Sequence, residues 1–282
     1  MNTALKRKIS TLRKMLKNGI TKPCKMGDKI LLLATAPCAN YYFKNESVRK
    51  QFEEYDLAII NFMLLHSENE VFKLQPKYII LFDPIFYTEG LKGDIIDFDA
   101  KKAIKEILER VNWECYVVTT IFADFEVKND NIKYIRLNFL FKGYHDFLYP
   151  LFRRNWINMG FHNVIQGALF FAITFGYKTI AMLGCPYKHL KFHMETDGMH
   201  IEEHMHYYDK EPYMVFIPND ELEQKNPCFT MNLYKRAYES SKILWGIKRY
   251  ALREKAQIIN YSEDSEIDVF SVGKLNLENP GR

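Results

Sequence analysis

The sequence has few cysteines, and their spacing fits neither a metal site nor a disulfide scaffold. The 282-residue chain contains five cysteines, an odd number, and no CxxC pair. Disulfide frameworks and cysteine zinc sites both need regular spacing, so we exclude both. Unpaired cysteines are typical of a reducing compartment, and we therefore expect a cytoplasmic protein.

Long hydrophobic runs are also missing. The longest, residues 167–177, is far shorter than the roughly 20 residues that a membrane-spanning helix needs. The charged N-terminus is not followed by an apolar segment, so we expect no signal peptide. Hydrophobic residues make up 48% of the chain and aromatic residues 15%. This composition is sufficient for a folded core, and we expect a soluble globular protein.

Both common glycine-rich phosphate-binding loops are absent. The sequence contains neither GxGxxG nor GxxxxGK[ST]. The usual backbone cradles for dinucleotides and nucleoside triphosphates are therefore excluded.

Acidic residues are absent from residues 1–27, which carry eight lysines and arginines. Four apolar residues recur there at helical spacing and predict a short basic amphipathic helix. We keep two interpretations for residues 1–18: docking on an anionic membrane surface, or packing on the protein with a solvated basic face. We expect no nucleic-acid partner, because no basic patch interleaved with aromatic residues follows. The four apolar residues are Leu5, Ile9, Leu12 and Leu16.

Beyond this segment, short apolar runs alternate with helical stretches. The runs are apolar on both faces, as in parallel strands covered by helices on both sides. The alternation predicts one α/β domain, residues 28–282, with an open, doubly wound, mostly parallel sheet. The expected strands are residues 29–35, 56–61, 77–83, 115–120, 178–184 and 256–262, and the expected helices begin at Asp99, Asn163 and Met231.

Residues 185–228 fit neither period and are rich in histidine, tyrosine, acidic residues and proline. We expect a small lid over the carboxyl ends of the strands, where open α/β sheets bind ligands. Five of the chain's eight histidines lie between His189 and His206. "HIEEH" (His200–His204) matches the HxxEH zinc-protease motif, but that chemistry needs a helix, and the flanks lack helical periodicity. A zinc hydrolase and solvated loop histidines stay as alternatives to proton transfer.

"DFD" (Asp97–Asp99) spells the DxD motif of metal-dependent sugar transferases. Asp99 directly precedes a helical stretch, so we interpret it as a helix N-cap and Asp97 as a surface acid. The sequence therefore predicts no metal site.

Polar or small residues follow three of the expected strands. Thr35, Ala36 and Pro37 follow the first, Asn61 ends the second and Asp83 ends the third. Each alone is typical of a turn or cap. Because the carboxyl ends of parallel strands share one edge, the three positions together predict a nucleotide pocket.

These stretches, together with "NVIQGALFFAITFGYKTIAMLG" (residues 163–184), resemble the bacterial lipooligosaccharide sialyltransferases. That family uses CMP-sialic acid on a Rossmann-like sheet, a variant of the GT-A glycosyltransferase fold. The resemblance covers residues 28–262. Thr35 and Asp83 stand where the family has Asn, and Asn163 and Gln166 where it has Arg and Ser. These departures leave another nucleotide sugar open, and pterin pyrophosphokinase-like transferases share a related fold.

The resemblance implies an inverting transfer of a sialic acid-like sugar from a CMP-activated donor. The acceptor would be a glycan or lipid-linked sugar in the synthesis of lipopolysaccharide or capsule. No cofactor or metal is implied, because a leaving group with one phosphate can depart on hydroxyl or amide donors alone. The implied nucleotide-binding residues are Thr35, Ala36, Pro37, Asn61, Asp83, Asn163, Gln166 and Gly184.

The lid supplies the implied catalytic residues. His206 is the expected general base because imidazole titrates near working pH, and His204 is its alternative. Tyr187, Tyr207 and Tyr208 would donate to the departing phosphate. The enzyme would be cytoplasmic, or peripheral on the inner face of the membrane, and homo-oligomerisation stays open.

Overall fold

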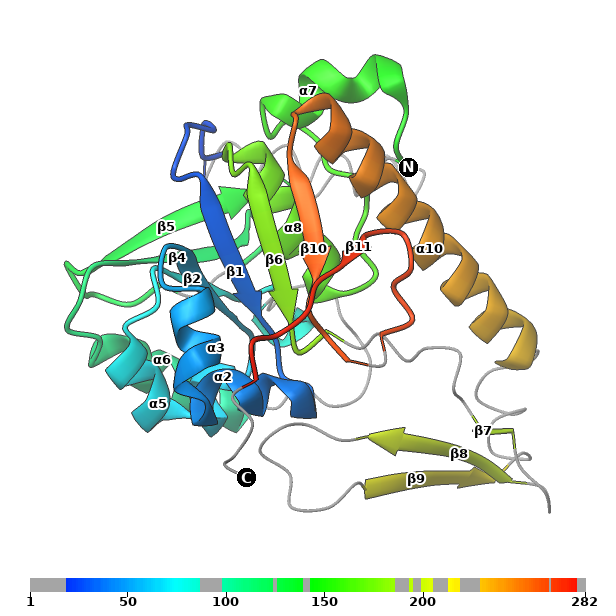
Figure 1. Cartoon of the computed structure of the whole chain (residues 1–282), viewed down its shortest axis with the longest axis horizontal. Coiled ribbons are helices and arrows are strands. Elements are labelled where there is room, and N and C mark those ends of the chain that lie inside the picture. Colours follow the sequence, from blue (N-terminus) through cyan, green and yellow to red (C-terminus); the bar gives the residue numbers. More distant parts are fainter. Residues whose placement is uncertain are drawn as a thin grey trace, which may run out of the picture.

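The computed structural model describes residues 19–86, 98–123, 126–138, 143–185, 193–194, 199–204, 213–218, 229–263 and 265–277. Its core is an eight-stranded sheet in which every neighbouring pair is parallel, so the predicted doubly wound α/β fold is confirmed (Figure 1). The strand order is β11-β10-β6-β1-β2-β3-β4-β5. The strands are β1 (Lys29–Leu33), β2 (Asp56–Ile60), β3 (Tyr78–Ile80), β4 (Cys115–Thr120), β5 (Ile132–Leu137), β6 (Thr179–Leu183), β10 (Gln257–Asn260) and β11 (Ser271–Val272).

The direction of winding reverses between β1 and β6. From β1 the chain builds outward through β2, β3 and β4 to β5, and then returns to place β6, β10 and β11 on the other side. Leu33, the last residue of β1, is in register with Leu183, the last residue of β6. Open α/β sheets bind ligands beside such a reversal, at the carboxyl ends of the strands.

Helices cover both faces of the sheet, because successive side chains of a strand point to opposite faces. Leu31 and Leu33 of β1 pack with the helices that follow β1, β2 and β3. Ile30 and Leu32 pack with α8 and α10 on the other face. The helical elements are η1 (Pro37–Ala39), α2 (Asn40–Lys44), α3 (Glu46–Gln51), α4 (Met63–His66), α5 (Glu68–Leu74), η2 (Pro84–Phe86), α6 (Phe98–Glu109), η3 (Asp146–Leu148), α7 (Tyr149–Arg153), α8 (Val164–Thr174) and α10 (Phe229–Arg253).

Helix α8 holds most of the longest apolar run of the sequence, and it lies in the core. Every residue from Ile165 to Thr174 is buried, as expected for a helix that is hydrophobic all round. The amphipathic α10 packs on its outer side (Figure 1). Of the helices that the structure describes, none has the length and apolar character to cross a membrane.

A partly buried polar cluster lies at the opposite, amino edge of the sheet. The Tyr177 hydroxyl donates to Asp56 Oδ2 at 2.5 Å, and the hydroxyls of Tyr177 and Tyr78 are 2.6 Å apart. Lys77 Nζ also donates to Asp56 Oδ2, at 2.7 Å. Burial is the main cause that raises the pKa of both tyrosines. We assign this cluster to stability.

Two strands were not predicted, and the start of one helix was predicted wrongly. β5 was missed because its sequence, IKYIRL, mixes charge with apolar residues, and β11 has only two residues. Helix α6 begins at Phe98, so Asp99 lies inside the helix and is not its N-cap. Asp97 lies outside the described residues.

The expected lid, residues 185–228, contains an antiparallel sheet of order β7-β8-β9. Figure 1 shows it beyond the carboxyl ends of the large sheet. Its strands are β7 (His193–Met194), β8 (Met199–His204) and β9 (Tyr213–Pro218).

Candidate functional site

The loop after β1 is held against the end of β6. Ala34 donates its backbone N–H to Leu183 O at 2.9 Å, and Ala36 donates to Gly184 O at 3.1 Å. Gly184 has a φ of +79°, and a Cβ there would lie 2.4 Å from Ala34 O. Only glycine fits both the left-handed backbone and this approach. Gly184 therefore sets the geometry of the winding reversal.

The loop itself carries three of the residues expected to bind the nucleotide. Ala36 is buried, whereas Thr35 and Pro37 are half-buried at the carboxyl edge. Pro37 begins η1, where a missing N–H costs nothing. Thr35 is thus the one of the three that brings a polar side chain to this edge.

Asn61 and Asp83 lie at neighbouring strand ends, and both also stabilise the local backbone. Asn61 has a left-handed φ of 48°, and its Oδ1 accepts the backbone N–H of Phe82 at 3.1 Å. Asp83 Oδ1 accepts the N–H of Ile85 at 3.1 Å, in a turn that starts η2. Burial raises the pKa of Asp83. The structure therefore brings the two strand ends together, through a bond between Asn61 and the residue before Asp83.

Helix α8 begins close to the end of β3. Gly167, in its first turns, packs so tightly that a Cβ there would lie 2.7 Å from Phe82 Cδ2. The rings of Phe82 and Phe161 are 6.5 Å apart, which places the segment before α8 over the same strand end. The amino end of α8, the positive end of the helix dipole, therefore lies at the carboxyl edge.

Asn163 caps this helix and leaves one donor unused. Its Oδ1 accepts the backbone N–H of Gln166 at 3.0 Å, which fixes the orientation of the amide. Its Nδ2 is buried, and no hydrogen-bond partner for it occurs in the part of the chain that the structure describes. An unsatisfied buried donor costs about 1–3 kcal/mol, so its presence calls for an explanation.

Gln166 lies in the core and not at the edge. Its side chain is fully buried, and its Nε2 donates to Ser240 Oγ at 2.8 Å and to Ser240 O at 3.1 Å. Its Oε1 accepts the backbone N–H of His162 at 2.8 Å. Gln166 therefore ties α8 to α10 and to the segment before α8, and its expected nucleotide contact stays a prediction.

The lid histidines of the zinc motif lie on a strand. His200 and His204 belong to β8, in register with Ile217 and Tyr213 of β9. Four residues of strand span about 13 Å, whereas the HxxEH chemistry needs two ligands on adjacent turns of one helix. The helical zinc-protease arrangement is therefore ruled out.

The remaining lid residues of the catalytic prediction, Tyr187, His206, Tyr207 and Tyr208, lie outside the described residues. Within the described ranges, no three histidine, cysteine or acidic side chains are grouped to hold a metal ion.

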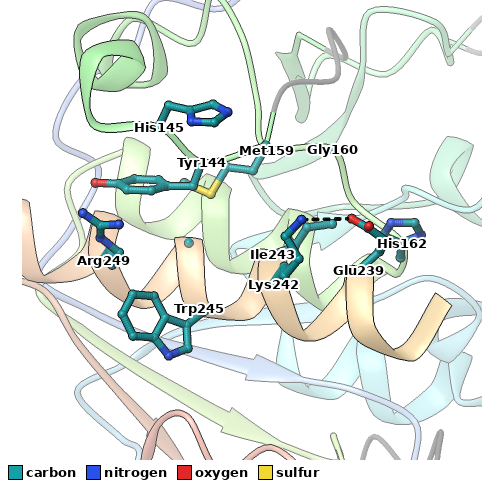
Figure 2. A pocket seen from close by; sticks show the side chains of 12 residues that line it. Tyr144, His145, Met159, Gly160, His162, Glu239, Lys242, Ile243, Trp245 and Arg249 are labelled. Atoms are coloured by element: carbon teal, nitrogen blue, oxygen red, sulfur yellow. Dashed lines mark ion pairs between the residues drawn. The ribbon is translucent and has the colours of Figure 1, made fainter. Parts of the chain in front are cut away.

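A cavity of about 480 Å³ opens between α10 and the segment before α8 (Figure 2). Its aromatic walls are Tyr144 and Trp245, and Arg249 lies between them, with Cζ 5.1 Å and 5.8 Å from the two ring centroids. Gly246 permits this packing, since a Cβ there would lie 2.5 Å from Tyr144 Cβ. At the other end are Glu239, Lys242 and His162, and His162 is next to Asn163 in sequence (Figure 2). Nothing in the sequence pattern predicted this cavity.

A second cavity, of about 490 Å³, lies at the carboxyl ends of β10 and β11. Ser262 Oγ on its wall accepts the backbone N–H of Cys185 at 2.8 Å, and Ser265 Oγ donates to Cys185 O at 3.1 Å. These bonds fix the exit of the chain from β6 into the lid segment.

No protein-family model and no curated protein matches the chain. A solved structure, that of the MAf glycosyltransferase from Magnetospirillum magneticum AMB-1, is similar, with 11% sequence identity and a TM-score of 0.47. The similarity covers 94% of this chain and 38% of that one, so this chain spans well under half of that protein's length. A structural similarity this weak does not support any statement about the activity of this chain.

Proposed function

We propose that the chain is a glycosyltransferase that takes a sialic acid-like sugar from a CMP-activated donor. The observation that carries the proposal is the Nδ2 of Asn163 at the amino end of α8, which is buried and has no hydrogen-bond partner among the residues that the structure describes. A phosphate oxygen placed there would accept its hydrogen bond and face the positive end of the helix dipole. Charge-assisted hydrogen bonds of this kind are about twice as strong as neutral ones.

The nucleoside would lie across the ends of β1, β2 and β3. Thr35 and Asn61 supply polar groups for the ribose and base. A carboxylate accepts hydrogen bonds only, and cytosine offers its exocyclic amine where uracil offers a carbonyl. Asp83 at the end of β3 therefore favours cytosine over uracil.

The reaction is a displacement at the anomeric carbon. An acceptor hydroxyl oxygen forms the new glycosidic bond, and the bond from that carbon to the phosphate oxygen of CMP breaks. The electron pair leaves with CMP, and the hydroxyl proton passes to a base. We assign this base to His206, with His204 as the alternative, and the charge on departing CMP to Asn163, Tyr187, Tyr207 and Tyr208, without a metal.

The acceptor is a glycan or lipid-linked sugar of a surface polysaccharide. Residues 1–18 carry the basic, apolar pattern of a segment that docks on anionic membrane, where a lipid-linked acceptor would lie. These residues lie outside the described part of the chain.

A thermal-shift screen tests the proposal. The protein is melted with CMP, UMP, GMP and AMP and with the corresponding nucleotide sugars. A ligand that binds only the folded state raises the midpoint, by about 2.7 kcal/mol of stability at 100 times its dissociation constant. CMP and CMP-sialic acid should raise the midpoint and UMP should not. If only UDP-sugars raise the midpoint, the donor is a UDP-sugar and not a CMP-sugar. If no nucleotide raises it, the proposal is wrong.

A further inference from the structure

The cavity between α10 and the segment before α8 has no part in the donor site described above. It contains about 480 Å³, within the range of small-molecule sites. It combines two aromatic side chains with a carboxylate, an ammonium and a guanidinium group (Figure 2). A small number of polar groups that converge between aromatic walls is typical of a ligand pocket.

The cavity has an open aromatic platform. Trp245 lines it and leaves 58% of its surface exposed, although tryptophan is on average well buried. Trp156, also exposed, does not line the cavity. The hydrogen-bearing face of a pyranose ring is apolar and flat enough to pack on an indole, so Trp245 suits a sugar ring.

Charges in the cavity are paired. Lys242 Nζ lies 3.7 Å from Glu239 Oε2, and Arg249 Nη2 lies 2.5 Å from Asp146 Oδ2. Arg253, which does not line the cavity, shares Asp146 at 3.3 Å. Since each lining lysine or arginine already has a carboxylate partner, a phosphate or acidic sugar gains little here. A neighbouring acceptor and donor such as Glu239 and Lys242 match two adjacent hydroxyl groups of a neutral sugar.

The cavity also adjoins the donor site. His162 lines it and directly precedes Asn163, and the His162 backbone N–H is held by the core residue Gln166. A ring seated at the Glu239 end of the cavity would therefore lie beside the amino end of α8, where Ser240 of α10 is bonded to Gln166. We propose that this cavity is the acceptor subsite and that it binds a neutral pyranose. The assignment rests on the proposed glycosyl transfer.

Saturation-transfer NMR on the full chain tests the subsite. The probes are methyl glycosides of galactose, glucose and N-acetylglucosamine, with glucuronic acid and inorganic phosphate as charged comparisons. A neutral glycoside should bind the wild type, and Trp245→Ala should weaken it about tenfold or more, the loss expected for one large aromatic contact. Trp245→Phe should restore most of the affinity. Trp156→Ala, which removes an equally exposed indole, should leave the affinity unchanged.

CMP titrated into the same variants separates the subsite from the proposed function. CMP should bind Trp245→Ala as it binds the wild type. If CMP never binds but glycosides bind at Trp245, the transferase proposal fails and the sugar site stands. The subsite is overturned if no neutral glycoside binds, if the two alanine variants behave alike, or if glucuronic acid or phosphate binds more tightly.

Discussion

Replacing Gln166 with methionine tests whether this residue supports the structure or contacts a nucleotide. Methionine has nearly the same shape but no hydrogen-bonding amide. The substitution removes the bond that Gln166 makes to the hydroxyl of Ser240, a residue 3% exposed, and the bond that it accepts from the His162 N–H. Each buried group left unpaired costs about 1–3 kcal/mol. His162 is exposed, so water can replace the lost partner of its N–H, and Ser240 O lies within helix α10. We therefore expect the free energy of unfolding to fall by about 1–3 kcal/mol in total.

In a chain of this length, each kcal/mol lowers the melting midpoint by roughly 2–4 °C. Calorimetry of Gln166→Met, Ser240→Ala and the double variant should therefore show a coupling of at least about 0.5 kcal/mol between the two residues. The reasoning is refuted if Gln166→Met melts like the wild type and loses CMP binding. Gln166 would then be the nucleotide contact that the sequence resemblance implied.

Three further predictions concern other parts of the chain. Tyr177→Phe should cost about 1–3 kcal/mol in urea unfolding, because Asp56 and Tyr78 lose a buried partner, whereas Tyr238→Phe, at an exposed tyrosine, should cost almost nothing. Burial raises the pKa of Cys115 to about 12 and also raises that of Tyr177. Since the unfolded thiol and phenol lose their protons first, near pH 9–10, the stability that these two groups contribute is constant below that range and lost above it; a protein whose stability does not fall between pH 9 and pH 11 would contradict this. His206→Ala should lower kcat by about 10²–10⁴ with little change in donor affinity, and normal turnover in both His206→Ala and His204→Ala would exclude a histidine base.

The large sheet was predictable because its central strands are buried on both faces. Runs such as KILLL and DLAII leave no alternation that could indicate an exposed face, and parallel strands are the usual result. β5 was not predicted because it is an edge strand with a solvated face, and Lys133 and Arg136 interrupt its apolar pattern.

The candidate site was only partly predictable. Asn61 and Asp83 were correctly placed at one edge, since parallel strands end together. Sequence could not show that Gln166 is buried, because its partner Ser240 is 74 residues away. The cavity between α10 and the segment before α8 was not predictable for the same reason: Tyr144 packs against Gly246, which is far away in the sequence. The one available signal was a tryptophan, Trp245, on the solvent side of an amphipathic helix.

Asn163 is proposed to hold a donor phosphate at the amino end of α8. Asn163→Ser and Asn163→Asp both keep an N-cap oxygen and remove Nδ2, so neither should destabilise the unliganded protein. Calorimetric titration with CMP is the direct measurement. Serine should weaken CMP about 10- to 100-fold, the worth of one hydrogen bond to a charged group, and aspartate should weaken it further by repulsion. Unchanged CMP affinity in two variants as stable as the wild type would contradict the account.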